Sequence, residues 1–395
     1  MDARTGLPTV GMVGAGQLAR MTHQAAIALG QSLRLLADTP SDGAALVAGD
    51  VVIGDYRSLP DLQAFARGCD VLTFDHEHVP AAHLQALLDA GVTVLPGPSA
   101  LRFAQDKAAM RARMAELDVP GPDWLDLTVQ AEPLAAGVRF AEQVGWPVVA
   151  KAISGGYDGK GVWMLDSAAE LEGLLATGTR LLVEAKADID FEIAAVAARS
   201  PFGQGAAWPV VQTVQTDGIC TEVIAPAPYL SAAAAERASG LALRIAEQLD
   251  VVGVLAVELF VERSGRLLVN ELAMRPHNSG HWTIEGARTS QFEQHLRAVL
   301  DYPLGSTAQT APVVVMANVL GGPEDTTPTL DERVHHLMAR WPDVKIHLYG
   351  KGFRPGRKVG HVTALGRDLA TVRQRAKAAA DYLSLGDRAE VDAHG

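Results

Sequence analysis

VLAVELFVERSGRLLVNE occupies residues 254–271. Both ends of this stretch are apolar runs typical of β-strands, and Ser264-Gly265 between them is typical of a two-residue hairpin turn. In that register Glu258 lies directly opposite Glu271, about 5 Å away on the same face. Two carboxylates that close repel each other by about 3 kcal/mol at an effective dielectric of about 20. The pair therefore predicts a site for a hard divalent cation, with Mg²⁺ the expected ion, and the alternatives are a raised carboxyl pKa or a slipped register.

A glycine-rich loop follows an earlier apolar strand. Residues 154–161 read SGGYDGKG, shortly after a strand that ends at Lys151. Such a loop can fold its backbone amides around a polyphosphate while Lys151 adds a cation from a rigid strand. It is not a Walker loop, because Lys160 is followed by glycine and not by Ser or Thr. The pattern predicts nucleotide binding, with a flexible hairpin as the alternative, and the strand at residues 181–186 leads to Glu192, which could accept from a ribose hydroxyl.

Polar residues crowd the segment after the hairpin, where residues 270–281 read NELAMRPHNSGH. Packing alone does not explain such polar density next to a buried strand. Arg275 can clamp a phosphate or a carboxylate through two parallel hydrogen bonds, and His277, Asn278 and His281 can supply donors or a base. The segment is therefore expected to contact a substrate.

The N-terminal region alternates strands and helices over roughly its first 100 residues, which is typical of a parallel sheet in an α/β protein. Residues 14–19 read GAGQLA between a strand and a helix, and Asp38 ends the next strand. This matches a dinucleotide-binding fingerprint, but the same turn can bind another phosphate or merely allow close packing. Ser99 is expected to cap a following helix that carries residues 105–107.

Composition and charge exclude several classes of protein. Lys and Arg number 34 and Asp and Glu 46, a net charge of −12 at pH 7, which opposes binding to nucleic acid or to anionic membranes. The two cysteines, Cys69 and Cys220, indicate a reducing compartment. No apolar run reaches the roughly 18 residues of a membrane span. We therefore expect a cytoplasmic protein with two or three domains.

Several of these motifs together resemble a known family. The glycine loop, the segment 270–281, TSQFEQH at 289–295 and the basic region 348–358 are similar to 5-(carboxyamino)imidazole ribonucleotide synthase, an ATP-grasp family of purine biosynthesis. The resemblance covers nearly the whole chain and implies an α/β ATP-grasp fold and a homodimer. It implies an N-terminal Rossmann-like parallel-sheet domain (1–98), an ATP-grasp domain (99–300) and a small C-terminal domain that completes the substrate site (301–395).

The resemblance also implies roles for individual residues. ATP would contact Lys107, Lys151, Gly156, Tyr157, Asp158, Gly159, Lys160, Gly161, Glu184, Lys186, Ala187, Glu192, Asn270 and Glu271. Mg²⁺ would bind Glu258 and Glu271. Aminoimidazole ribonucleotide would contact Tyr157, Asp158, Lys160, Arg275, His277, Asn278, Lys351, Arg357 and Lys358. Arg275, Asp158 and Lys151 would act in catalysis. The chain departs from the family pattern at Asp75, commonly Glu, at Lys160, commonly Arg, and at Gln215, near a common His.

The implied reaction is activation of bicarbonate by ATP to carboxyphosphate, followed by carboxylation of the exocyclic amine of aminoimidazole ribonucleotide with release of ADP and phosphate. Three other classes of protein remain open from the sequence. They are a different ATP-grasp enzyme, such as biotin carboxylase or formate-dependent glycinamide ribonucleotide transformylase, a nicotinamide dehydrogenase, and a nucleotide sensor without catalysis.

Overall fold

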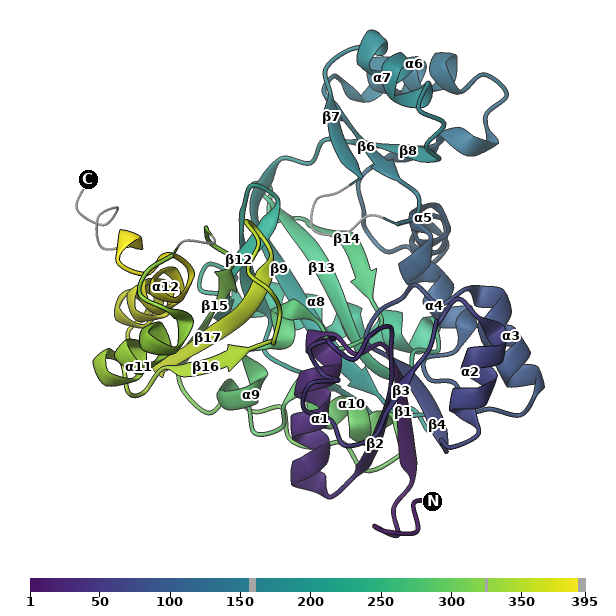
Figure 1. Cartoon of the computed structure of the whole chain (residues 1–395). Coiled ribbons are helices and arrows are strands. Elements are labelled where there is room, and N and C mark those ends of the chain that lie inside the picture. Colours follow the sequence, from purple (N-terminus) through teal and green to yellow (C-terminus); the bar gives the residue numbers. More distant parts are fainter. Residues whose placement is uncertain (156–160, 324–325, 390–395) are drawn as a thin grey trace.

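The computed structural model describes residues 1–155, 161–323 and 326–389. The N-terminal part forms a four-stranded parallel sheet in the order β3-β2-β1-β4, which confirms the predicted α/β class (Figure 1). Its strands are β1 (Thr9–Val13), β2 (Ser32–Ala37), β3 (Val51–Ile53) and β4 (Val71–Phe74), and its helices are α1 (Gln17–Leu29), α2 (Leu59–Ala66) and α3 (Ala81–Asp89).

The helix expected from Ser99 through residue 107 is wrong, because the chain forms two helices there. α4 (Pro98–Gln105) begins after Gly97, and α5 (Lys107–Glu116) begins after Asp106. Asp106 has an extended backbone, with φ −131° and ψ 107°, and its side chain accepts a hydrogen bond from the backbone of Ala109 at 2.8 Å. This N-cap places Lys107 in the first turn of α5.

A small lobe, residues 124–185, forms a second, antiparallel sheet in the order β5-β8-β6-β7 and stands at the top of Figure 1. Its own core is built from residues such as Leu127, Val148 and Leu171. Its elements are β5 (Trp124–Asp126), the 3-10 turn Leu127–Val129, α6 (Pro133–Val144), β6 (Val148–Ala152), β7 (Val162–Leu165), α7 (Ala168–Leu175) and β8 (Leu181–Ala185).

The large sheet runs β14-β13-β9-β11-β12-β15-β17-β16, with β10 paired to β9. The strands of the predicted C-terminal domain thus continue the sheet that carries the hairpin. Its strands are β9 (Ile189–Arg199), β10 (Gly205–Ala207), β11 (Val211–Thr216), β12 (Ile219–Ala225), β13 (Gly253–Glu262), β14 (Leu267–Ala273), β15 (Val313–Leu320), β16 (Lys345–Leu348) and β17 (Lys358–Gly366).

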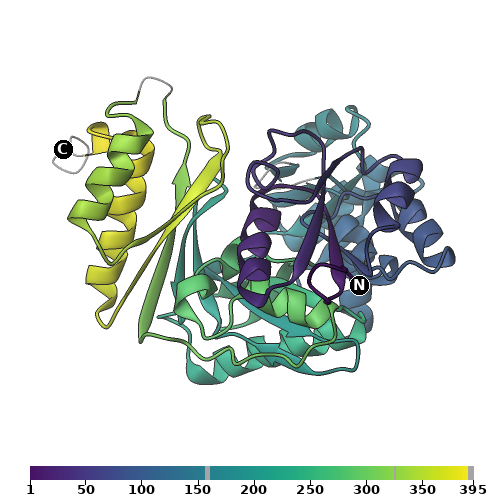
Figure 2. The same cartoon turned by 60° about the horizontal axis from the view of Figure 1, so that its bottom comes forward.

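Helices cover this sheet in two places. α11 and α12 pack on its C-terminal strands, on the side away from the N-terminal domain (Figure 2), and α8 packs on β9 and β13. The helices of this part are α8 (Ala232–Gln248), the 3-10 turn Asn278–Gly280, α9 (Thr283–Gly286), α10 (Gln291–Val299), α11 (Leu330–Arg340) and α12 (Leu369–Leu385). No helix among the described residues has the length and apolar character needed to cross a membrane.

The β13–β14 hairpin confirms the predicted pairing of Glu258 with Glu271, although the predicted turn is wrong. The turn has three residues and not two, since Glu262 and Arg266 close it by hydrogen bonds and Gly265 takes a φ of +82°. Such a turn shifts the pairing by one residue. A β-bulge restores it, because Glu258 pairs with Glu271 while the next residue, Leu259, pairs with Val269.

Candidate active site

Only one carboxylate of the hairpin pair has a cationic partner among the described residues. Partial burial, together with Glu271 and Glu192, raises the pKa of Glu258 to about 7. Lys107 forms an ion pair with Glu271 and not with Glu258. His277 Nε2 lies 3.7 Å from Glu258 Oε1, but burial lowers the pKa of His277 to about 3, so its ring is neutral at physiological pH. Glu258 therefore has no charged ion-pair partner among the described residues.

The donor set of this pair fits a magnesium ion. Within residues 1–155, 161–323 and 326–389, no group of three or more His, Cys, Asp or Glu side chains is arranged to hold a metal. Mg²⁺ commonly binds through one or two carboxylates and completes its six oxygen ligands with water and substrate phosphates. Glu258 and Glu271 would supply two oxygens, and a nucleotide phosphate would complete the site.

Arg111, on α5, holds the bulge of the hairpin in place. Its guanidinium donates to the carbonyl oxygens of Val269 at 2.5 Å and of Asn270 at 3.0 Å, and its Nε lies 2.6 Å from Glu184 Oε1. The side chain is 2% exposed, so these contacts are shielded from water. The extra residue of a bulge leaves backbone groups outside the strand ladder. Arg111 thus binds two carbonyls at the bulge, on the edge strand β14, and ties the hairpin to strand β8 of the small lobe.

Lys151 lies beside this cluster on β6. Its Nζ is 2.8 Å from Glu184 Oε2 and donates to Asn270 Oδ1 at 2.9 Å. Burial lowers the pKa of Lys151, and Glu184 counteracts the shift. Burial alone would raise the pKa of Glu184, but Lys151 and Arg111 together hold it below its usual value. The structure thus brings together Lys151, Glu184 and Asn270, all named in the sequence analysis. Lys151 forms an ion pair with Glu184 and a hydrogen bond with Asn270.

An apolar surface next to Lys151 was not predicted. In the small sheet Lys151 pairs with Val162 and Val149 pairs with Met164, so these side chains share one face. Val162 and Met164 are 41% and 51% exposed, although both belong to a strand. An exposed apolar face beside a buried lysine suits a flat heterocyclic base.

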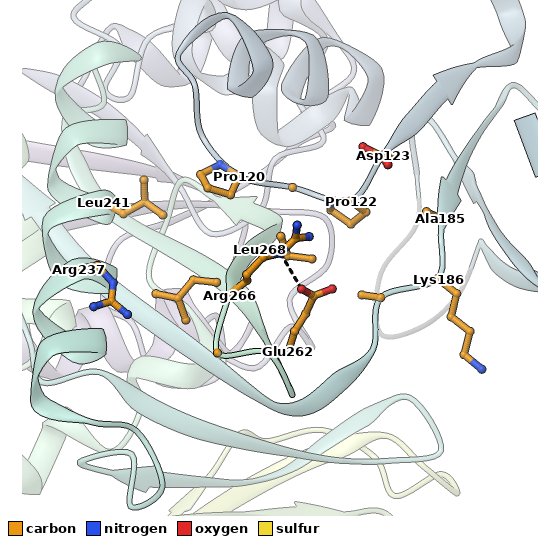
Figure 3. A pocket seen from close by; sticks show the side chains of 14 residues that line it. Pro120, Pro122, Asp123, Ala185, Lys186, Arg237, Leu241, Glu262, Arg266 and Leu268 are labelled. Carbon is orange, nitrogen blue, oxygen red and sulfur yellow. Dashed lines mark hydrogen bonds and ion pairs between the residues drawn. The ribbon is translucent and has the colours of Figure 1, made fainter. Parts of the chain in front are cut away.

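Three more of the predicted nucleotide contacts lie on other segments. Lys186 and Ala187 follow β8 directly and line the pocket that Figure 3 shows, and Glu192 lies on β9. Burial raises the pKa of Glu192, and Gln215 donates to its Oε2 at 3.3 Å. Gln215, where the chain departs from the family pattern, therefore hydrogen-bonds Glu192, the residue predicted to contact the ribose.

A cavity of about 650 Å³, called the second cavity below to distinguish it from the region around Lys151, lies between the start of α1 and the basic loop of the C-terminal region. Lys351 and Arg357 line it, whereas Lys358 does not. Lys351 donates to Gln17 Oε1 at 2.5 Å, which joins the loop to the N-terminal domain. The cavity is lined by Gly14, Ala15, Gly16, Asp38, Ser41, Asp42, Gly43, Leu46, Asp75, His76, Gly350, Lys351, Gly352, Arg354 and Arg357.

The turn formed by Gly14, Ala15 and Gly16, just before α1, is part of this cavity, and the carboxylate of Asp75 lies against its backbone. The backbone of Gly16 donates to Asp75 Oδ2 at 2.5 Å, and a Cβ added at Gly14 would overlap the same carboxylate. The glycines therefore allow close approach of Asp75.

Glu77, which the sequence analysis did not single out, holds Arg275 between the carboxylate pair and the second cavity. The Nε of Arg275 lies 2.6 Å from Glu77 Oε2, and Glu77 also accepts from the backbone of Met274 at 3.3 Å. Burial acts to lower the pKa of Arg275, but Glu77, with Asp75 and Glu271, holds it above its usual value. Arg275 is thus close enough to Asp75 of the second cavity and to Glu271 of the carboxylate pair to be influenced by both.

The other residues of the polar segment divide into two groups. The amide nitrogen and oxygen of Asn278 are buried without a hydrogen-bond partner among the described residues. His277 receives support from Gln291, which accepts from its backbone at 2.8 Å. His281 is fully buried with Gln291 Nε2 3.1 Å from its Nδ1, so it packs inside the protein.

The predictions for Gly156, Tyr157, Asp158, Gly159 and Lys160 lie outside the described residues. Gly161, which ends the glycine loop, is described, and its carbonyl accepts from the backbone of Ala152 at 2.8 Å.

Comparisons with known proteins identify this arrangement. The chain matches the ribonucleotide synthetase preATP-grasp domain over residues 7–105, the ATP-grasp domain over 112–292 and the phosphoribosylaminoimidazole carboxylase C-terminal domain over 314–375. It is 57% identical over 383 residues to the N5-carboxyaminoimidazole ribonucleotide synthase of Mycobacterium tuberculosis, covering 96% of this chain and 88% of that protein. The corresponding protein of Corynebacterium ammoniagenes is 48% identical over 386 residues, covering 96% and 92%.

The chain belongs to the N5-carboxyaminoimidazole ribonucleotide synthase family. It is an ATP-grasp enzyme for ATP-dependent carboxylation of 5-aminoimidazole ribonucleotide in purine biosynthesis, as the sequence predicted. The three other classes left open by the sequence are thereby set aside.

Solved structures of N5-carboxyaminoimidazole ribonucleotide synthases share the fold. The enzyme of Thermus thermophilus gives a TM-score of 0.83 at 36% identity, over 96% of this chain and 99% of that one. The enzyme of Aspergillus clavatus, solved with ADP and 5-aminoimidazole ribonucleotide, gives 0.85 at 30% identity, over 95% and 98%.

Sequence reasoning missed Arg111 and Glu77, and only Arg111 left a signal. It falls on the same helical stripe as the buried residues Met110 and Met114 of α5, where an apolar side chain is expected. A charge in such a stripe indicates a buried partner. Glu77 is far from Arg275 in the sequence, and no local pattern joins them.

We predict that Arg111→Lys and Arg111→Met both lower turnover at least tenfold and raise the Mg²⁺ concentration needed for half-maximal rate. Lysine cannot reproduce the fork that reaches two carbonyls and a carboxylate, and methionine leaves Glu184 with one cation fewer, a loss of about 3–5 kcal/mol for a buried pair. ADP release and thermal unfolding measure both effects. Arg113→Lys, on the same helix but bound to exposed Glu116, is the control. Parental Mg²⁺ dependence in Arg111→Lys would contradict the assigned role.

A second prediction concerns pH. The pKa of Glu258 is raised in the folded protein, so without metal the folded state binds more protons than the unfolded state between about pH 4.5 and 7. Glu258 therefore destabilises the fold increasingly as pH rises through that window. In EDTA, Glu258→Gln should melt at a higher temperature than the parent at pH 8, by about 1 °C per kcal/mol recovered in a chain of this length, and at the same temperature near pH 4. An equal difference at both pH values would show that Glu258 is not the group responsible.

Proposed function

We propose that ATP binds between the small lobe and the β13–β14 hairpin. The adenine would lie against Val162 and Met164, and Lys107 and Lys151 would contact the phosphates. The observation that carries this proposal is the register that sets two carboxylates opposite each other beside a buried lysine from the other lobe. The Aspergillus clavatus enzyme solved with ATP, 30% identical with a TM-score of 0.86, supports ATP as the nucleotide.

Mg²⁺ on Glu258 and Glu271 would neutralise charge on the transferring phosphoryl group. The chain's own residues would do the rest of the first step. Lys151 would hold the phosphates from β6, and Arg275, oriented by Glu77, would hold bicarbonate. A bicarbonate oxygen attacks the γ-phosphorus, the bond to ADP breaks, and carboxyphosphate forms.

In the second step the amine of aminoimidazole ribonucleotide attacks the carboxyl carbon, phosphate leaves, and the amine loses one proton. We place the ribonucleotide in the cavity between α1 and the basic loop, with its 5′-phosphate on Lys351 and Arg357. His277, Asn278 and Lys358 do not line that cavity and remain proposed contacts of the ribonucleotide. Tyr157, Asp158 and Lys160, which lie outside the described residues, are further proposed contacts, with Asp158 orienting the amine or taking its proton.

The other parts of the assignment remain proposals with the boundaries given above: domains at 1–98, 99–300 and 301–395, a homodimer, and a cytoplasmic location. The experiment that tests the function is ADP release with aminoimidazole ribonucleotide and bicarbonate each left out in turn. Release should require ATP, Mg²⁺ and the ribonucleotide together. Steady turnover with glycinamide ribonucleotide and formate instead would overturn the assignment.

Removing one carboxylate should stop turnover without unfolding the protein. Glu271→Gln keeps the size of the side chain but removes a metal ligand, so we expect turnover to fall by roughly 10²-fold or more at saturating ATP. ADP release at several Mg²⁺ concentrations measures it, and Glu236→Gln, on the exposed side of α8, serves as the control. A variant that regains the parental rate at high Mg²⁺ has lost only affinity; an unchanged rate at all concentrations would mean that Glu271 does not bind the ion.

Substitutions in the two proposed phosphate-binding regions should change the KM values of different substrates. Each charge-assisted contact contributes about 1.5–3 kcal/mol, or roughly ten- to a hundredfold in affinity. Lys351→Ala and Arg357→Ala should therefore raise the KM for aminoimidazole ribonucleotide with little change for ATP, and Lys151→Ala should do the reverse. If the loop variants lose ATP affinity to the same extent as ribonucleotide affinity, the assignment of the cavity is wrong.

A further inference from the structure

Two glutamines in the run TSQFEQH at residues 289–295, Gln291 and Gln294, are fully buried on α10. A buried amide is costly unless its donors and its acceptor are paired. Each of these amides pairs with the backbone of one residue in a loop beside the helix, Gln291 with His277 and Gln294 with Gly305. The two glutamines thus make the same kind of contact, but only that of Gln291 holds a segment proposed to contact a substrate.

Gln291 binds the polar segment at both of its ends. Its Oε1 accepts from the backbone N–H of His277 at 2.8 Å, and its Nε2 donates to the carbonyl oxygen of the same residue at 2.7 Å. Because donor and acceptor belong to one residue, the backbone itself determines which end of the amide carries the nitrogen. The second hydrogen of Nε2 is available for Nδ1 of His281, 3.1 Å away. One side chain therefore closes residues 277–281 into a fixed turn.

Gly280 leaves the room that this amide occupies. A Cβ at position 280 would lie 2.3 Å from Oε1 and 2.5 Å from Cδ of Gln291, which is closer than such atoms approach in proteins. Thr283 holds both residues from the other side, since its Oγ1 accepts from the backbone of Gln291 at 2.9 Å and donates to the carbonyl oxygen of Gly280 at 2.5 Å. A side chain at position 280 would therefore displace the glutamine amide.

The fixed turn also orients the ring of His277. Its Nδ1 accepts from the backbone N–H of Ser279 at 3.3 Å and lies 2.9 Å from the hydroxyl of the same serine. Because Nδ1 accepts there, a neutral ring carries its proton on Nε2. That Nε2 lies 3.7 Å from Oε1 of Glu258, one of the two carboxylates assigned to the metal ion. The turn thus places a hydrogen-bond donor beside the proposed metal site.

We infer that Gln291 is a positioning residue, which acts through the backbone of His277 to set where the His277 ring and the Asn278 amide meet the substrates. Loss of the pair would free the backbone of the turn, and a misplacement of about 1 Å can lower a rate by about 100-fold. The kinetic consequence rests on the proposed role of His277 and Asn278 as contacts of the ribonucleotide. The contact between Gln291 and His277 does not depend on that role.

Gln294 supplies a matched control on the same helix. Its Oε1 accepts from the backbone of Gly305 at 2.7 Å, and its Nε2 donates to the carbonyl oxygen of Gly305 at 2.9 Å. Both glutamines are 0% exposed, so replacing either one with methionine removes two backbone hydrogen bonds at equal burial. Gly305 lies in the loop between α10 and β15 and has no assigned contact with a substrate.

Steady-state kinetics test the positioning role. Gln291→Met should lower kcat/KM for aminoimidazole ribonucleotide at least tenfold with little change in the KM for ATP. Gly280→Ala, which keeps the glutamine but displaces its amide, should change the same constant in the same direction, and it decides the question if Gln291→Met does not fold. Gln294→Met should lose thermal stability as Gln291→Met does and keep the parental kinetics. Parental kcat/KM in both Gln291→Met and Gly280→Ala, or an equal loss in Gln294→Met, would overturn the inference.

Hydrogen exchange tests the contact itself and needs no turnover. The backbone N–H of His277 should exchange at least tenfold faster in Gln291→Met than in the parent, and that of Gly305 should do so only in Gln294→Met. Equal exchange at His277 in Gln291→Met and the parent would show that the amide does not hold the turn. A parent enzyme that does not turn over the ribonucleotide would overturn the proposed function and the kinetic part of this inference, while faster exchange at His277 would still establish the contact.

Discussion

The buried guanidinium of Arg111 is the contact on which the geometry of the active site depends. A three-residue turn moves the β13–β14 pairing by one position, and the bulge at Asn270 moves it back before Glu271. The carbonyls of Val269 and Asn270 at this bulge accept from Arg111, which also holds Glu184. Glu184 and Asn270 in turn fix Lys151. One side chain thus connects the register of the hairpin to the position of the cation on the other lobe.

The charge distribution follows from what must be bound. The chain carries a net charge of −12, so its positive groups are effective only where they are concentrated. Lys107 pairs with Glu271, Lys151 binds Asn270 next to it, and Lys351 and Arg357 line the second cavity. Arg275 is held between them by Glu77. Each cation near the reacting groups is positioned by a carboxylate or an amide, which keeps it in place before substrate arrives and limits the reorganisation needed during reaction.

Local patterns predicted part of this structure. The alternation of strands and helices gave the parallel N-terminal sheet, and the strands at Lys151 and Glu271 were found from apolar runs. Glu258 was placed opposite Glu271 correctly although the turn was wrong, because the unpredicted bulge cancelled the error. The end of one helix and the start of the next at Asp106 were not predicted, because Ser99 is a plausible N-cap for a single helix. Glu77 and Arg275 meet only through tertiary packing, which a single sequence does not encode in any short window. The exposed Met164 could not be recognised before its sheet neighbours were known.

The most direct test is a crystal structure of the enzyme with a non-hydrolysable ATP analogue, Mg²⁺ and aminoimidazole ribonucleotide. The account predicts a metal ion bound by both Glu258 and Glu271, phosphates on Lys151, adenine against Met164, and the ribonucleotide phosphate on Lys351 and Arg357. A metal ion bound elsewhere, with Glu258 and Glu271 turned apart, would contradict it.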